Sequence, residues 1–166
     1  MKKNKTSKSW VIKQHRDQFF KRSKIEGYRS RSAFKLIEMN SKFKLINKNS
    51  LLLDLGSSPG GWSQVSSNII TKGKILSIDK KIMKNIKKVN FIKGDFTSKD
   101  SQKEILNYFG EKINLVMSDM AASTSGNKDM DSYQTGELCL KAIDFAAKIL
   151  NKEGVFLGKV FMGSIF

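Results

Sequence analysis

The sequence predicts an α/β fold in which a mostly parallel β-sheet is covered by helices on both faces. From residue 51 onward, short apolar runs alternate with longer segments of helical character, which is the pattern of repeated βαβ units. Acidic residues follow several of the apolar runs, at the sheet edge where α/β proteins bind their ligands. The chain has 166 residues, a length that fits one domain of this class.

The first fifty residues are predicted to form a basic, mostly helical extension of that domain. Residues 1–9 are polar and basic, a composition typical of a disordered arm. A helix is expected over residues 10–27, where apolar side chains recur and Gly27 ends the segment. A second helix is expected to start at an N-cap serine, Ser30 or Ser32, and to run through the segment AFKLIEMNSKF.

Residues 51–166 are predicted to form the core of the domain. Five apolar runs of strand length are expected to build the sheet: 51–56, 74–79, 89–95, 113–119 and 154–161. Three further segments are expected to form the helices that cover it: 62–70, 98–110 and 134–150. Gly110 is expected to be the C-cap of the second of these helices.

Positive charge is concentrated at the amino-terminal end of the chain. The net charge is +16; residues 1–50 carry 15 Lys and Arg against 3 Asp and Glu, and residues 51–166 carry 16 against 12. A genome-wide bias toward lysine would spread this charge evenly, so the sequence favours a polyanionic partner such as RNA. Arg29 and Arg31 are candidate phosphate contacts, and Tyr28 beside them is able to stack on a base. Ordinary solvated helix charges are the alternative.

Composition excludes several classes of protein. Cys139 is the only cysteine and His15 the only histidine, so an internal disulfide, a histidine-based triad and a Cys- or His-rich metal site are not expected. No apolar run approaches the roughly 18 residues of a membrane span, and the apolar segment of a secretory signal is missing. The sequence therefore predicts a cytoplasmic protein, expected to be a monomer, that uses neither a metal nor a membrane.

A glycine-rich segment, residues 54–62 with the sequence DLGSSPGGW, joins the first predicted strand to the next helix. Glycines in such a turn let the backbone approach a ligand closely. The spacing differs from the G-x-G-x-x-G pattern that cradles a dinucleotide pyrophosphate, and no P-loop lysine follows. A nicotinamide dehydrogenase is therefore disfavoured, and a ligand without phosphates fits better.

Three aspartates follow successive predicted strands. Asp79 closes the second strand, where an acid accepts hydrogen bonds from ribose hydroxyls. Asp95 follows the third strand, where it is expected to meet an adenine amino group, and Asp119 follows the fourth, close to the expected position of a sulfonium. Each aspartate alone is equally compatible with a surface turn or a helix cap. Together they favour S-adenosyl-L-methionine as the cofactor.

Five sequence motifs occur in a specific order. They are EGYRSRSAFKLIEM (26–39), LLDLGSSPGGWSQV (52–65), IKGDF (92–96), VMSDMAASTSG (116–126) and GKVF (158–161). In this order they resemble the FtsJ/RrmJ family of large-subunit ribosomal RNA 2′-O-ribose methyltransferases, and most of all its bacterial, uridine-specific branch. The resemblance runs from about residue 10 to the end of the sequence. It implies a Rossmann-like fold, S-adenosyl-L-methionine as methyl donor and RNA of the large ribosomal subunit as partner.

The resemblance also implies which residues form the site. The family uses a Lys-Asp-Lys-Glu tetrad, whose first three members match Lys35, Asp119 and Lys159. The closing glutamate has no counterpart, so the family's C-terminal β-hairpin, which carries it, is expected to be missing and the core to be truncated. By the same resemblance the cofactor contacts fall on Gly60, Trp62, Asp79, Asp95 and Asp119.

Lys159 is the expected general base, because it lies on the otherwise apolar strand GVFLGKVF and histidine is effectively unavailable. An ordinary lysine is protonated at neutral pH, so partial burial and the nearby cation Lys35 are expected to favour the neutral amine, with Asp119 orienting the pair.

Two other functions stay open. One is 2′-O-methylation of transfer RNA by the same superfamily, and the other is a non-catalytic RNA-binding role in ribosome assembly.

Overall fold

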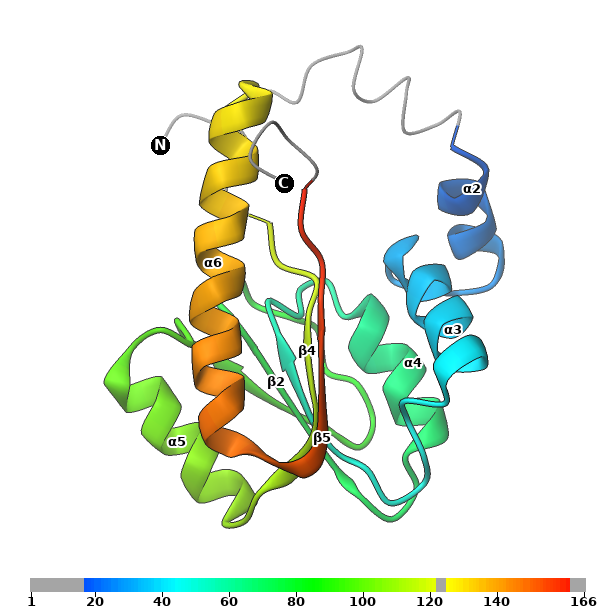
Figure 1. The fold of residues 1–166 in the computed structure, drawn as a ribbon. Coiled ribbons are helices and arrows are strands. Elements are labelled where there is room, and N and C mark those ends of the chain that lie inside the picture. Colours follow the sequence, from blue (N-terminus) through cyan, green and yellow to red (C-terminus); the bar gives the residue numbers. More distant parts are fainter. Residues whose placement is uncertain (1–16, 122–124, 162–166) are drawn as a thin grey trace.

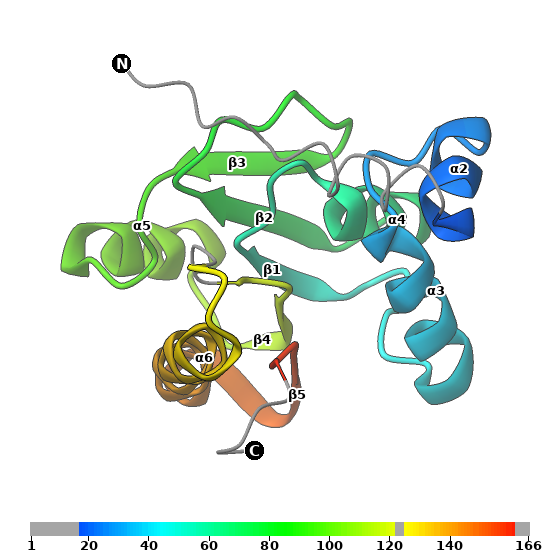
Figure 2. The ribbon, with the colours of Figure 1, turned by 90° about the horizontal axis from the view of Figure 1, so that it is seen from above.

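The computed structural model describes residues 17–121 and 125–161 of the chain. It confirms the predicted α/β fold, with one sheet between two layers of helices (Figures 1 and 2). The helices are α2 (Gln18–Ile25), α3 (Ser32–Phe43), α4 (Gly61–Ile69), α5 (Lys99–Phe109) and α6 (Lys128–Ile149). The strands are β1 (Leu51–Leu55), β2 (Lys74–Asp79), β3 (Val89–Lys93), β4 (Ile113–Ser118) and β5 (Leu150–Gly158).

The five strands are parallel and follow the order β3-β2-β1-β4-β5. The chain builds the sheet outward from β1 to β3 and then returns to add β4 on the other side of β1. Strand order therefore reverses between β1 and β4, and ligands of open α/β sheets bind at the carboxyl ends of the strands at such a reversal. Gly56 follows β1 and Asp119 follows β4 at this point.

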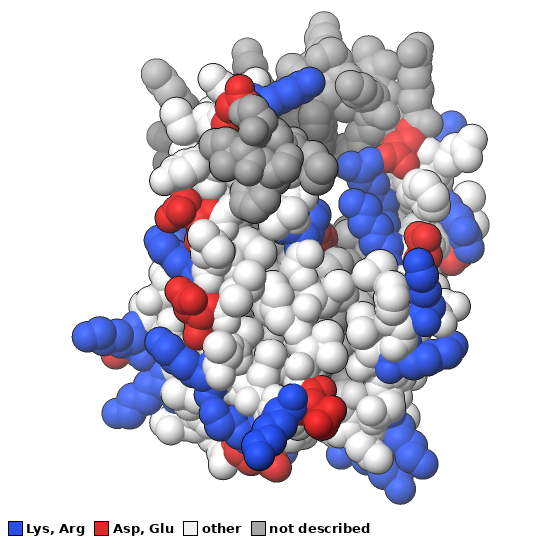
Figure 3. All heavy atoms as spheres, viewed as in Figure 1, with Lys and Arg blue, Asp and Glu red and all other residues white. Residues whose placement is uncertain are grey.

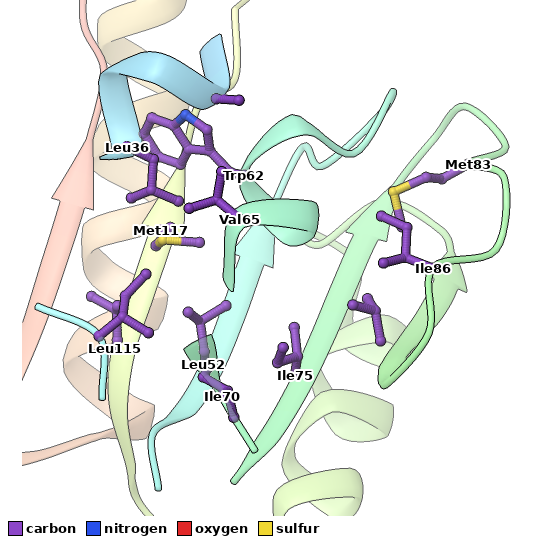
Figure 4. Close-up of a cluster of buried hydrophobic side chains, with 13 residues drawn as sticks. Leu36, Leu52, Trp62, Val65, Ile70, Ile75, Met83, Ile86, Leu115 and Met117 are labelled. Atoms are coloured by element: carbon purple, nitrogen blue, oxygen red, sulfur yellow. The ribbon is translucent and has the colours of Figure 1, made fainter. Parts of the chain in front are cut away.

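Strand periodicity divides the core between the two faces of the sheet. Alternate side chains of a strand point to opposite faces, so Leu52 packs under α3 and α4, whereas Leu53 and Leu55 pack under α5 and α6. Figure 4 shows the first of these clusters, in which Trp62 of α4 lies close to Leu36 of α3. By the same alternation Asp54 shares the face of Leu52, where it becomes a buried carboxyl group.

Most predicted elements are confirmed to within two residues, and Gly110, at φ 68°, is the C-cap of α5 as expected. At the amino-terminal end two predictions are wrong. Asp17 has an extended backbone and its carboxylate caps α2, so no single helix passes through residues 10–27; residues 10–16 lie outside the described part. The N-cap of α3 is Arg31, because the hydroxyls of Ser30 and Ser32 bond each other rather than the helix.

The start of α6 was also predicted wrongly, six residues too late. Asn127 caps the helix by accepting hydrogen bonds from the backbone N–H groups of Asp129 and Met130, and the first turns are polar rather than periodically apolar. Strand β5 was predicted wrongly at both ends: it runs from Leu150 to Gly158 rather than over 154–161, so Lys159 follows the strand instead of lying on it. Its pairing with β4 is irregular between Ile113 and Leu115. β5 is the outermost described strand on its side.

In the described part of the chain, no helix is long and apolar enough to cross a membrane. Within those same residues, no group of three or more His, Cys, Asp or Glu side chains is placed to hold a metal ion.

Candidate functional site

Two clefts open side by side at the carboxyl ends of the strands. The first has a volume of about 430 Å³ and is lined mainly by residues that follow β2, β3 and β4, among them Asp79, Lys80 and Asp95. The second has a volume of about 400 Å³ and lies between the glycine-rich turn and the amino-terminal segment, with Arg29 and Arg31 in its wall. Gly56, Ser58 and Asp119 line both clefts. Asp119 therefore stands where the two clefts meet.

Gly56 is required for this junction. Its φ of 71° lies in the left-handed region, and an added Cβ would collide with the side chain of Met120. Its backbone N–H donates to the carbonyl of Ile78 at 2.8 Å, which ties the turn after β1 to the end of β2. A side chain at this position would displace Met120 and strain the backbone.

The first cleft presents the carboxylates of Asp79 and Asp95. Asp79 accepts hydrogen bonds from the backbone N–H groups of Ser58 at 2.9 Å and Lys81 at 2.7 Å, so it fixes the turns after β1 and β2. Asp95 accepts from the backbone and hydroxyl of Thr97, and it pairs with Lys80 at 2.8 Å. Desolvation raises the pKa of Asp95, but the hydrogen bonds from Lys80 and Thr97 outweigh it and lower the pKa to about 2. Asp95 is therefore ionised at any physiological pH.

Lys159 and Asp119 form an ion pair at the junction. Lys159 follows β5, and its backbone N–H donates to the carbonyl of Ser118 at 2.9 Å, so the two residues lie side by side at the ends of neighbouring strands. The Lys159 Nζ donates to Asp119 Oδ1 at 2.5 Å and to the Asp119 carbonyl at 3.0 Å. Both side chains are largely buried, with 26% and 21% of their surface exposed. This pair brings together two residues that the sequence predicted for one site.

Lys35 makes no bond to this pair among the described residues. It is an exposed residue of α3. Its predicted role as the neighbouring cation is not tested by this geometry.

Gly60 and Trp62 hold the glycine-rich turn against other parts of the chain. Gly60 has φ 108°, and a Cβ there would lie 2.8 Å from Ile86 and 2.9 Å from Met83. The Trp62 indole N–H donates to the Ser32 carbonyl at 2.9 Å, and its ring lines the second cleft. Neither residue is in the lining of the first cleft. Their cofactor contacts stay a prediction.

The three predicted RNA contacts each have a partner within the protein. Tyr28 packs edge-on against Phe34, with ring centroids 5.4 Å apart, and Arg31 is paired with Asp17. The Arg29 guanidinium donates to the carbonyls of Lys84 at 2.5 Å and Asn85 at 2.6 Å, with a longer contact to the carbonyl of Pro59 at 3.4 Å. Figure 3 shows that basic side chains gather over α2 and α3 on the face it presents. Contact of these three residues with RNA stays a prediction.

Replacement of Arg29 by alanine is expected to lower the free energy of unfolding by about 1–3 kcal/mol, because it removes charge-assisted hydrogen bonds that join two loops. Arg31→Ala is the matched control, since the Arg31 side chain is 60% exposed and such surface pairs contribute at most about 1 kcal/mol. Urea unfolding of both variants measures the difference. Equal losses would mean that the Arg29 guanidinium does not tie the loops together.

Asp54 and Ser57 were not predicted as site residues. Asp54 Oδ2 accepts from the Ser63 hydroxyl at 2.5 Å, and Ser63 in turn bonds Ser77 at 2.8 Å. Asp54 Oδ1 and the Ser57 hydroxyl oxygen are buried without a hydrogen-bond partner among the described residues, and both residues line the second cleft. Burial raises the pKa of Asp54 to about 7; the Ser63 hydrogen bond opposes this, and the charges of Asp119 and Asp79 add to it. The sequence signal was an acid inside the apolar run LLLDL.

The first turns of α6 hold the two loops that carry Asp119 and Lys159. The Asp131 carboxylate accepts from the backbone and hydroxyl of Ser125, at 2.6 and 2.8 Å, in the segment that follows β4. The Ser132 hydroxyl donates to the Phe161 carbonyl at 2.9 Å, just after Lys159. The backbone hydrogen bond from Ser125 is the largest influence on Asp131 and lowers its pKa. Both loops are thus anchored to one helix end.

Comparison with known proteins agrees with this geometry. A family model described as FtsJ-like methyltransferase matches residues 28–166. Ribosomal RNA large subunit methyltransferase E of Pelagibacter ubique is 48% identical over 166 residues, which are 100% of this chain and 82% of that protein. The protein of the same name from Rickettsia canadensis is 40% identical over 98% of this chain and 74% of its own length. A crystal structure described as a ribosomal RNA methyltransferase from Plasmodium falciparum is 36% identical, with a TM-score of 0.75 over 82% of this chain and 80% of that chain.

Proposed function

The chain belongs to the FtsJ-like methyltransferase family, and from this premise we propose that it methylates a ribose 2′-hydroxyl of a uridine in large-subunit ribosomal RNA. The observation that carries the proposal is the Lys159–Asp119 pair at the meeting point of two clefts. One cleft suits a methyl donor and the other a nucleotide. The relatives named for action on large-subunit ribosomal RNA support the choice of substrate, and such a substrate is met in the cytoplasm.

The first cleft fits S-adenosyl-L-methionine. Its lining holds the carboxylates of Asp79, Asp95 and Asp119, which suit ribose hydroxyls, an adenine amino group and a positively charged sulfur respectively. Lys80, which also lines this cleft, is paired with Asp95 at 2.8 Å. When bound, S-adenosyl-L-methionine supplies an electrophilic methyl group.

Lys159 acts on the 2′-hydroxyl in this proposal. In the ion pair Lys159 is an ammonium, so it must release one proton before it can act as a base. The neutral amine then has one lone pair and two N–H donors, which the carbonyl and carboxylate of Asp119 can accept. The lone pair would then accept the proton of the 2′-hydroxyl as the hydroxyl oxygen takes the methyl group that S-adenosyl-L-methionine would supply, with sulfur as the leaving group. Asp119 fixes the amine at the junction, and such alignment contributes several kcal/mol to lowering the barrier.

Asp79→Ala is expected to weaken binding of S-adenosyl-L-methionine about 10- to 100-fold, because a charge-assisted hydrogen bond contributes roughly 1.5–3 kcal/mol. Isothermal titration calorimetry measures this effect. Asp144→Ala, an exposed aspartate of α6 outside the first cleft, is the control and should bind as the wild type does. An Asp79→Ala protein that is folded and binds the donor normally would contradict the assignment of this cleft.

Methyl transfer from radiolabelled S-adenosyl-L-methionine tests the proposal directly. Large ribosomal subunits lacking the modification and transcribed transfer RNA are offered separately, and the labelled nucleotide is identified after digestion. Label on a ribose of the large-subunit RNA is the expected result. Transfer to transfer RNA alone would favour the related tRNA activity, and RNA binding without transfer to either substrate would favour a non-catalytic assembly factor.

A further inference from the structure

The connection between β2 and β3, residues 80–88, carries five lysines and no acidic residue. We call this segment the lysine loop. We propose that the lysine loop is a second RNA-contacting surface, which binds the phosphate backbone of the substrate beside the two clefts. The proposal rests on the proposed function, because it assumes that the substrate is RNA, and it adds a contact outside the basic amino-terminal region.

Two of the three apolar residues of the lysine loop, Met83 and Ile86, face the protein, whereas Ile82 is 74% exposed. Met83 and Ile86 are 6% and 8% exposed and belong to the core cluster under α3 and α4. Figure 4 shows their side chains lying next to each other. Both pack so closely on Gly60 that a Cβ there would lie within 3 Å of each. Met83 and Ile86 thus hold the loop against the core, and the lysines next to them, Lys84, Lys87 and Lys88, are exposed to solvent.

Arg29 fixes the backbone of the loop to the wall of the second cleft. Its two terminal nitrogens donate to the carbonyls of Lys84 and Asn85, and Arg29 itself lines that cleft. At its other end the loop starts at the first cleft, which Lys80 and Lys81 line. Because β2 and β3 are parallel, the connection then runs along the outer side of β3 to the amino-terminal end of that strand (Figure 2). The loop therefore passes the rims of both clefts before Lys87 and Lys88 lead into β3.

Four lysines of the loop have no anionic partner. Lys80 is paired with Asp95, but Lys81, Lys84, Lys87 and Lys88 are all exposed, and none forms an ion pair with another described residue. Other exposed lysines of the described chain also lack an ion pair, but the loop differs in its local charge: it has five lysines and no acid, whereas in α5 Lys99 and Lys103 are each followed directly by an acid.

Exposed cations without counterions, on an ordered backbone, suit a polyanion, since each phosphate they neutralise releases a bound counterion. RNA that places a ribose at Asp119 and Lys159 has its flanking backbone close to the cleft rims, where the lysine loop lies. The loop thus offers phosphate contacts that add affinity without reading sequence.

The test compares two triple variants of the full chain. Lys84, Lys87 and Lys88 are replaced by alanine in the first, and Lys103, Lys141 and Lys152, exposed lysines of α5, α6 and β5, in the second. Binding of a transcribed large-subunit ribosomal RNA is measured over a salt series, and S-adenosyl-L-methionine affinity is measured by calorimetry. The loop variant is expected to bind RNA at least about tenfold more weakly at low salt, and its slope of log affinity against log salt should be shallower by about 2. The control variant should stay within about threefold of wild type.

A loop variant that binds RNA as the control does, with normal donor affinity, would overturn the inference while leaving the proposed function intact. If the wild type neither binds nor methylates the RNA, the proposed function fails first. A third protein, with Lys84, Lys87 and Lys88 all replaced by arginine, keeps the charge and should keep the wild-type salt slope. If it loses binding as the alanine variant does, charge on the loop is not the cause and the inference is wrong.

Discussion

Lys159→Ala is expected to reduce methyl transfer by about 10²- to 10⁴-fold, the range that a positioned general base contributes. The Lys159 amine lies 2.5 Å from Asp119 Oδ1 at the junction of the two clefts, and the chain's only histidine, His15, lies outside the described residues. Alanine removes the proton acceptor, whereas Asp79 and Asp95 in the first cleft are untouched. Affinity for S-adenosyl-L-methionine should therefore stay within a few-fold of wild type.

Single-turnover methyl transfer and calorimetric donor binding separate these two effects. Lys159→Arg is a second variant that tests the need for a proton acceptor. Arginine keeps the positive charge and pairs with carboxylates, but it does not lose its proton. It should be as inactive as the alanine variant. Lys152→Ala, at an exposed position of β5, the strand that precedes Lys159, is the control and should be fully active. Near-normal turnover in Lys159→Ala or Lys159→Arg would eliminate Lys159 as the base.

The stability of the protein is expected to fall as the pH rises from about 4 to about 7, because of Asp54. Burial raises the pKa of this carboxyl from 3.8 to about 7, so between those values the folded state holds a proton that the unfolded state has released. Stability then decreases with pH across this window, and above it the loss totals about 4 kcal/mol. Asp95, whose pKa is lowered to about 2, has the opposite effect: its stabilising contribution is present above pH 4 and is lost as the pH falls toward 2.

Asp54→Asn should remove most of this dependence. Asparagine still accepts a hydrogen bond from Ser63 but has no proton to lose, so the variant should be more stable than wild type at pH 8 and close to it at pH 5. Chemical unfolding at a series of pH values measures how the free energy of unfolding of each protein changes with pH. Asp144→Asn, at an exposed position of α6, should follow the wild-type curve. Parallel curves for wild type and Asp54→Asn would show that Asp54 is ionised in the folded protein.

The sheet and the grouping of the acids were determined by local sequence. A strand buried on both faces is mostly apolar, so β1, β2 and β4 were predicted to within one residue. Parallel strands place their carboxyl ends along one edge, and this brought the predicted Asp79, Asp95 and Asp119 into the lining of a single cleft. The start of α6 was missed because its first turns are held by the Asn127 cap and by Asp131 rather than by apolar periodicity.

Only the tertiary structure decided what the long charged side chains contact. Arg29 was expected to face RNA, yet its guanidinium bonds carbonyls that lie far along the chain in the lysine loop. Lys159 reaches Asp119, whereas Lys35 stays exposed on α3. Asp54 became a buried carboxyl because strand alternation turns it toward Ser63 of α4. The partners of a long, flexible side chain depend on which groups lie within its reach, and the packing of helices and loops on the sheet determines those groups.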